Sequence, residues 1–108
     1  MIHEIATIRV KSGTEAAFEA AVSLAAPLFR RSPGCRTMRL TRSIEQPQSY
    51  HLVVGWDTVE DHMEGFRNSP EMIEWRALIS DYLAAPPEVQ HYENIHPDLL
   101  SAFPGEQS

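Results

Sequence analysis

The sequence holds a single cysteine, Cys35, among its 108 residues. One cysteine excludes a disulfide within the chain and is typical of proteins in a reducing compartment. No apolar run reaches the length of a membrane-spanning helix, and the first residues lack the basic and apolar regions of a signal peptide. We therefore predict a cytoplasmic protein with no membrane partner.

Positive charge is also scarce, with 9 Lys and Arg against 15 Asp and Glu and a net charge of −6 at pH 7. This balance argues against binding to nucleic acid. The charge is unevenly spread: residues 1–42 hold seven Lys and Arg and three Glu, whereas residues 43–108 hold two Arg and twelve acids. Such a split can draw two copies of the chain together, attract an anionic ligand, or leave solvated charges on strand edges.

Sequence motifs for common cofactors are missing as well. There is no Gly-rich dinucleotide or phosphate loop, and the His, Cys and acidic residues have no spacing typical of a metal site. Cys35 has no neighbouring His in the sequence, which disfavours a cysteine nucleophile. We expect no cofactor and no metal.

Hydrophobic periodicity predicts six elements in the order βαββαβ. Strands are expected at residues 2–11, 35–43, 50–56 and 88–95. One helix is expected after the turn at Gly13, with a kink or break at Pro27, and a second helical region lies between Asp57 and the Pro-rich stop at residues 85–87. These elements fit an α+β, ferredoxin-like domain, a four-stranded antiparallel sheet with two helices on one face. We assign the domain to residues 1–95 and a C-terminal tail to residues 96–108.

Two helices can cover only one face of such a sheet. The other face would carry alternate residues of the strands, including apolar ones, and an exposed apolar face usually marks an interface. We therefore predict a homodimer in which two sheets pack face to face. Leu99, Leu100 and Phe103 of the tail are candidates to lie across the partner.

The second helical region has two predicted starts. Asp57 is the expected N-cap of the first part, with Glu60 completing a capping-box pattern. Ser69 is the expected N-cap of the second part, ahead of Pro70. The first part should turn Val59, Met63 and Phe66 toward the sheet, and the second should turn Met72, Trp75, Ile79 and Tyr82 the same way.

Histidines supply the candidate general base. His62 lies beside the apolar stripe and is either a structural residue or a half-exposed base that opens onto a cavity. His91 shares a strand face with Val89, which points either to the core or to the dimer face. His51 lies on the strand face opposite Tyr50, and only one of these two faces can meet the helices.

Large aromatic rings gather around the same region. These rings either form ordinary core or wall a pocket for a flat apolar ligand. They are Trp56, Phe66, Trp75 and Tyr82.

The segments SPGC, SYHLVVGWDTVEDHMEGFRNSPEMIEWR and PPEVQHY, together with the element order, resemble the antibiotic biosynthesis monooxygenase (ABM) family over about residues 3–95. The resemblance implies a dimeric α+β barrel. It also implies a range of roles, since some members are cofactor-free monooxygenases of phenols or quinols, some degrade heme, and many have no known role. The heme degraders use an Asn, a Trp and an axial His. By counting, these positions fall on Ala6, Phe66 and Arg76 here, which disfavours heme degradation.

Two functions follow from these observations. The first is a cofactor-independent monooxygenase of a quinol-, phenol- or anthrone-like small molecule, with His62 as the base. Its substrate-binding residues would be Phe66, Trp75, Trp56, Tyr82 and His91. The alternative is a non-catalytic dimeric module that binds an apolar metabolite. A catalytic His62 should open onto a cavity, whereas a structural one should be buried and bonded to the backbone.

Overall fold

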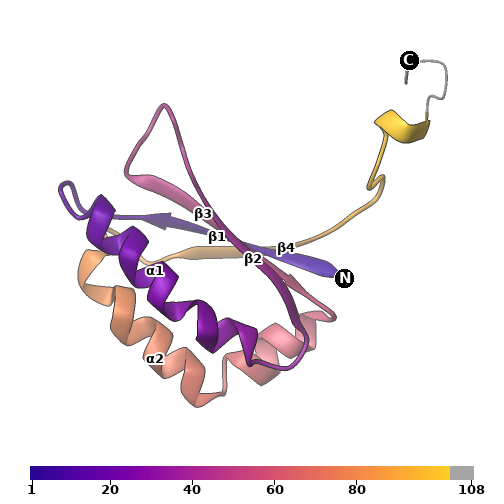
Figure 1. Ribbon diagram of the computed structural model, residues 1–108, viewed down its shortest axis with the longest axis horizontal. Coiled ribbons are helices and arrows are strands. Elements are labelled where there is room, and N and C mark those ends of the chain that lie inside the picture. Colours follow the sequence, from indigo (N-terminus) through magenta and orange to yellow (C-terminus); the bar gives the residue numbers. More distant parts are fainter. Residues whose placement is uncertain (103–108) are drawn as a thin grey trace.

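The computed structural model describes residues 1–102. Four strands, β1 (Ile2–Arg9), β2 (Cys35–Arg42), β3 (Ser49–Trp56) and β4 (Glu88–Glu93), form one antiparallel sheet in the order β2-β3-β1-β4. Helices α1 (Glu15–Arg30) and α2 (Pro70–Ile79) both lie on one side of this sheet (Figure 1). The predicted ferredoxin-like fold is therefore confirmed. No helix within residues 1–102 is both long and apolar enough to cross a membrane.

Helix α1 packs on the sheet through the apolar stripe that the sequence predicts. The stripe residues Phe18, Val22, Ala25 and Phe29 are all buried. The helix continues to Arg30 through Pro27, so the expected break is wrong. Proline removes only its own N–H donor, and the burial of Leu28 and Phe29 against the sheet holds the last turn in place.

The second helical region begins one residue later than predicted. Thr58, rather than Asp57, supplies the cap, because its Oγ1 accepts a hydrogen bond from the Asp61 N–H at 3.1 Å. Asp57 instead accepts two hydrogen bonds from the Arg36 guanidinium, at 2.9 and 2.6 Å. The turn between α1 and β2 lies against this start of the helical region. At Gly34 in this turn φ is +83°, and a Cβ would collide with the Asp61 carboxylate.

A π-helical segment, η1 (Asp61–Phe66), follows this cap. The Arg67 N–H donates to the His62 carbonyl at 3.0 Å, which is the i to i+5 bond of a π turn. The wider turn brings His62 and Phe66 onto the buried face and leaves Met63 37% exposed. The prediction that Met63 faces the sheet is therefore wrong.

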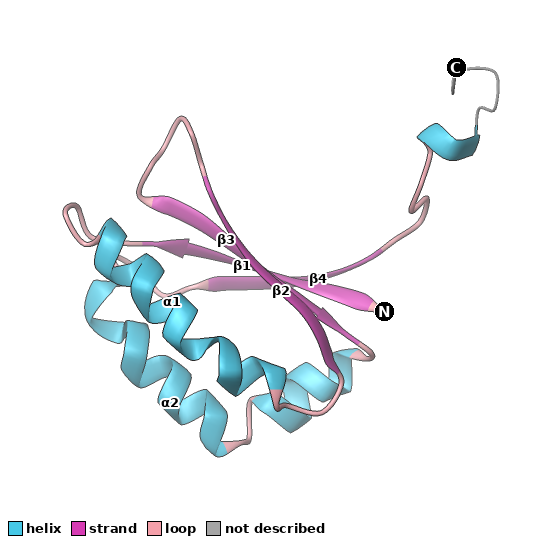
Figure 2. Ribbon diagram, in the orientation of Figure 1, coloured by secondary structure: helices cyan, strands magenta, loops and turns pink. Residues whose placement is uncertain are grey.

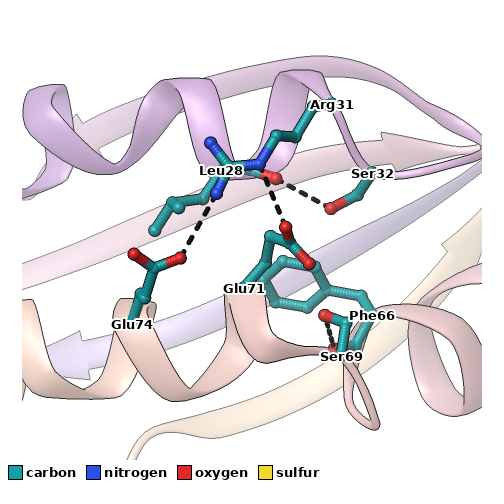
Figure 3. Close-up of polar contacts among 7 residues, drawn as sticks. All are labelled: Leu28, Arg31, Ser32, Phe66, Ser69, Glu71 and Glu74. Atoms are coloured by element: carbon teal, nitrogen blue, oxygen red, sulfur yellow. Dashed lines mark hydrogen bonds and ion pairs between the residues drawn. The ribbon is translucent and has the colours of Figure 1, made fainter.

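Helix α2 starts where predicted, with Ser69 as N-cap. Figure 3 shows how this start is tied to α1: the Arg31 guanidinium donates to Glu71 at 3.0 Å and to Glu74 at 3.2 Å. The Ser69 hydroxyl donates to the Phe66 carbonyl at 2.6 Å. The exposed ion pairs add little stability, but they align the helix ends near the residues that follow η1. A short 3₁₀ helix, η2 (Ser80–Tyr82), completes the region.

The sheet has a covered face and an open face. Tyr50 and Leu52 of β3 are buried under the helices, whereas His51 is exposed on the other side. Neither α1 nor α2 lies on that open side (Figure 2). The residues that share the face with His51 are mostly polar, with Ile5 and Val53 as apolar members.

The chain after β4 leads away from the sheet to a short 3₁₀ helix, η3 (Leu100–Ala102) (Figure 1). Leu99 and Leu100 are 54% and 77% exposed. Phe103 lies outside the described residues.

Candidate active site

A cavity of about 280 Å³ lies between the covered face of the sheet and the second helical region. Phe66, Trp75 and Ile79 line it from the helical side, and Ala6 and Leu52 line it from the sheet. These five side chains are apolar and buried. The cavity therefore suits an apolar or aromatic ligand.

Glu4 brings a carboxyl group into this apolar wall. It lies on the central strand β1, opposite Val54 of β3 and His91 of β4, and is only 5% exposed. Its Oε1 accepts a hydrogen bond from Nε1 of Trp56 at 3.0 Å. The indole of Trp56 is itself fully buried, so this bond fixes the carboxyl group at the cavity wall.

His62 lies beside Glu4 in the cavity wall. Its Nε2 lies 3.3 Å from Oε1 of Glu4, and its Nδ1 lies 2.8 Å from Nε2 of His91. The imidazole stacks on Trp56, with 5.4 Å between ring centroids and 19° between planes. His62 is 4% exposed, so the expectation of a half-exposed imidazole is wrong. The reason is the π turn, which directs this side chain inward along with Phe66.

Burial shifts both titratable groups toward their uncharged forms. It raises the pKa of Glu4 from 4.5 to about 7, against the opposing effects of the Trp56 hydrogen bond and the Arg67 charge. Burial, together with the smaller effects of the His91 and Arg67 charges, lowers the pKa of His62 from 6.5 to about 4. Because the imidazole is neutral near pH 7, the 3.3 Å contact is a polar contact and not an ion pair.

The predicted aromatic residues take different places. Phe66 and Trp75 line the cavity, and both rings contact Phe29 of α1, with centroids 4.7 and 5.2 Å from it. Trp56 lies behind His62 and Glu4. Tyr82 is partly buried and packs against the hydrophobic core.

His91 faces the helices and not the open side of the sheet. It is half-buried on β4, opposite Glu4, and its Nε2 contacts His62. The three histidines therefore lie on two faces of the sheet. His62 lines the cavity and contacts His91 on the covered face, and His51 lies exposed on the open face.

Two arginines complete the cavity wall, Arg67 after η1 and Arg76 on α2. Neither forms an ion pair with a carboxylate of residues 1–102. Both side chains are largely exposed, so they place positive charge at the solvent side of an otherwise apolar cavity. An anionic group on a ligand would be attracted there.

Glu4 is not among the site residues predicted from the sequence. Its signal is visible in the strand alternation, because Glu4 occupies the same strand face as Ala6 and Ile8, which are both buried. A carboxyl group on a buried apolar strand face is costly unless it is bonded, and such a group is a candidate for function.

The three positions that correspond by counting to the heme degraders' Asn, Trp and His lie together in the cavity wall. They are Ala6, Phe66 and Arg76. None of the three carries the matching side chain. Within residues 1–102, no group of three or more His, Cys, Asp and Glu side chains is placed to hold a metal ion.

Comparison with known proteins agrees with the fold and places the chain in a family. The family model for Antibiotic biosynthesis monooxygenase (ABM) matches residues 1–78, and the chain belongs to this family. The uncharacterized protein YczJ of Bacillus subtilis (strain 168) is 39% identical over 95 residues, which cover 88% of this chain and 100% of YczJ.

Solved structures share the fold. A protein from Bordetella bronchiseptica assigned to the antibiotic biosynthesis monooxygenases is 50% identical, with a TM-score of 0.87 and coverage of 88% of this chain and 97% of that one. SnoaB from Streptomyces nogalater, a cofactor-independent oxygenase, is 18% identical with a TM-score of 0.76, over 88% of this chain and 93% of its own. At that identity, the likeness to SnoaB shows a common fold alone.

Proposed function

We propose that this protein is a cofactor-independent monooxygenase of a small aromatic hydroxy compound, such as a quinol, phenol or anthrone. The observation that carries the proposal is an apolar cavity with a buried carboxyl–imidazole pair, Glu4 and His62, in its wall. Membership of the ABM family supports it, and SnoaB shows that this fold can serve an oxygenase that needs no cofactor.

The size and charge of the cavity favour a particular substrate. An apolar cavity of roughly 150 Å³ holds one benzene ring. The cavity here measures about 280 Å³ and suits roughly two fused rings. Phe66 and Trp75 supply ring surfaces for stacking, and Arg67 and Arg76 favour the ionised form of an aromatic hydroxyl group.

For this reaction the protein must remove a proton from the substrate and hold the substrate in an apolar environment that excludes water. After the aromatic compound loses a proton, the resulting anion can pass one electron to dioxygen. The two radicals combine into a peroxide on a ring carbon. Loss of water then leaves a carbonyl group, so that one oxygen atom enters the product and the other becomes water, and the substrate supplies all the electrons. The proton-accepting groups available at the cavity are Glu4 and His62.

We also propose that the protein works as a homodimer. The open face of the sheet carries Ile5 and the nearly buried Val53 among polar residues. The chain after β4 leads away from the sheet (Figure 1), and its Leu99 and Leu100 have more than half of their surface exposed. A second copy that packs on the open face would cover these side chains.

Oxygen uptake and ligand binding, measured with a panel of two-ring quinols and phenols and with the three-ring anthrone, test the proposed function. Val89 of β4 lines the cavity and is 37% exposed, so Val89→Trp should fill the cavity and abolish both signals. Ile73→Trp places the same ring on the exposed side of α2, away from the cavity and from the open face of the sheet, and is the matched control. Binding without oxygen uptake would instead favour a non-catalytic module for an apolar metabolite. No binding by any member of the panel would contradict both functions.

A further inference from the structure

We propose that Glu4, and not His62, is the catalytic residue that accepts the substrate's proton, and that His62 and His91 position it. This assignment rests on the proposed function, because it needs an aromatic hydroxy compound in the cavity. It goes further in naming the atom that receives the proton, Oε2 of Glu4.

The contacts of His62 leave it no free nitrogen for a substrate. Nε2 is directed to Oε1 of Glu4 at 3.3 Å, and Nδ1 contacts Nε2 of His91 at 2.8 Å. One face of the ring is stacked on Trp56. An imidazole held in this way can orient its neighbours, but a general base must reach the proton that it abstracts.

Glu4 has the free atom that His62 lacks. Its Oε1 receives the Trp56 N–H and faces His62. No hydrogen bond or ion pair within residues 1–102 occupies Oε2, and the residue lines the cavity. Trp56 and His62 thus hold one carboxyl oxygen and leave the other for the ligand.

The groups that face Glu4 come from several elements. His62 of η1, Arg67 after it and His91 of β4 are the titratable or charged neighbours on its own side of the sheet, with Arg76 of α2 across the cavity. Burial and, to a smaller degree, the nearby charge of Glu4 raise the pKa of the Cys35 thiol of β2. Helix α1 contributes the uncharged Phe29 to the cavity.

This environment suits a base that works near neutral pH. Burial raises the pKa of Glu4 to about 7, so the carboxylate is present at neutral pH and holds a proton better than an ordinary carboxylate. The pKa of His62, lowered to about 4, makes its imidazole a much weaker base. Geometry and basicity therefore select the same residue.

The proton that Glu4 removes from the substrate is returned within the same turnover. The O–H or ring C–H bond of the substrate breaks, an O–H bond forms at Oε2, and the electron pair stays on the substrate. Dioxygen then adds to the ring carbon as a peroxide. Glu4 returns the proton to the terminal peroxide oxygen and gives a hydroperoxide. The hydrogen on the same ring carbon is then lost as a proton, its electron pair forms the C=O bond, the O–O bond breaks, and the departing hydroxide takes up that proton as water. The carboxylate is restored without any further acid or reductant.

The pH profile of kcat/KM separates the two possible bases. In the wild type, kcat/KM should rise with pH through about 7, the pKa of Glu4. Glu4→Gln should lower it by roughly 10²–10⁴-fold and remove this limb, and Glu4→Asp should keep the limb at a reduced rate. His62→Gln should move the midpoint of the limb without removing it. A limb near pH 4 that survives in Glu4→Gln would overturn the assignment and make His62 the base.

A measurement that needs no turnover distinguishes a failure of the assignment to Glu4 from a failure of the proposed function. Infrared difference spectra at about pH 8 with 2-naphthol, an unreactive two-ring phenol, test the contact itself. A phenol is a weaker acid than Glu4, so the bound hydroxyl group keeps its proton and donates a hydrogen bond to Oε2. Binding should therefore shift a carboxylate stretching band in the wild type, and this shift should be missing in Glu4→Gln. If the wild type turns over no substrate but shows this shift, the oxygenase function fails and the contact of the ligand with Oε2 stands. If 2-naphthol binds and the band does not shift, the assignment to Glu4 fails.

Discussion

Replacing Glu4 with Gln should change how the stability of the protein depends on pH. Folding raises the pKa of Glu4 from 4.5 to about 7, so the folded chain binds more protons than the unfolded chain between these values. The stability that this group contributes is fully present below pH 4.5 and is lost as the pH rises through 7. One pKa unit corresponds to about 1.4 kcal/mol, so the loss in the wild type is about 3 kcal/mol.

The Gln variant keeps the shape of the side chain and an oxygen for the Trp56 N–H but cannot ionise. Its free energy of unfolding, minus that of the wild type, should therefore rise by about 3 kcal/mol between about pH 4 and pH 8. The depressed pKa of His62 acts in the opposite sense, since its contribution is present above 6.5 and lost as the pH falls through 4. To a first approximation this contribution is common to both proteins, so subtraction removes it.

Urea titrations at a series of pH values supply both curves by linear extrapolation. Glu93→Gln, which removes an exposed carboxylate from β4, controls for the general effect of losing one charge. A flat difference between Glu4→Gln and the wild type would mean that burial does not shift this carboxyl group. A difference that falls with pH would mean that Glu4 and His62 form a true ion pair in the folded protein.

Three further predictions concern assembly, heme and the imidazole. Light scattering should give about twice the chain mass of 12.2 kDa. A monomer at micromolar concentration would contradict the homodimer that we infer from the open face of the sheet. Titration with hemin should give no sharp Soret band, since the cavity carries Ala6, Phe66 and Arg76 at the heme degraders' positions; a saturating band that His62→Ala abolishes would contradict this. His62→Ala should lower the free energy of unfolding by about 2–4 kcal/mol in urea titrations, because it empties a buried, stacked site. Leu24→Ala, at an exposed position of α1, is its control, and an equal loss in both variants would refute the role of burial.

Local patterns in the sequence were enough to predict the strands, α1 and the start of α2. The alternation of β3 separates Tyr50 and Leu52 from His51, and the helical spacing of Phe18 and Phe29 marks the buried side of α1. These features depend on residues near one another in the chain, where periodicity is informative.

The site depends on contacts that periodicity does not encode. The π turn at η1 includes an i to i+5 hydrogen bond, and in this turn His62 is buried and Met63 exposed. The meeting of Glu4, His62 and His91 requires the register of β1 against β4 and the position of η1 over the sheet. Spacing alone could therefore place His62 near the core but could not pair it with a carboxyl group.

Isotope labelling with ¹⁸O₂ tests most directly whether this protein is a cofactor-independent monooxygenase. Chelator-treated protein is given a two-ring quinol or anthrone under ¹⁸O₂, and the product is analysed by mass spectrometry. We predict one labelled oxygen atom per product molecule, with the second recovered in water, and no labelled product from Val89→Trp. An unlabelled product would contradict the proposed function. So would a labelled product that untreated protein forms and chelator-treated protein does not.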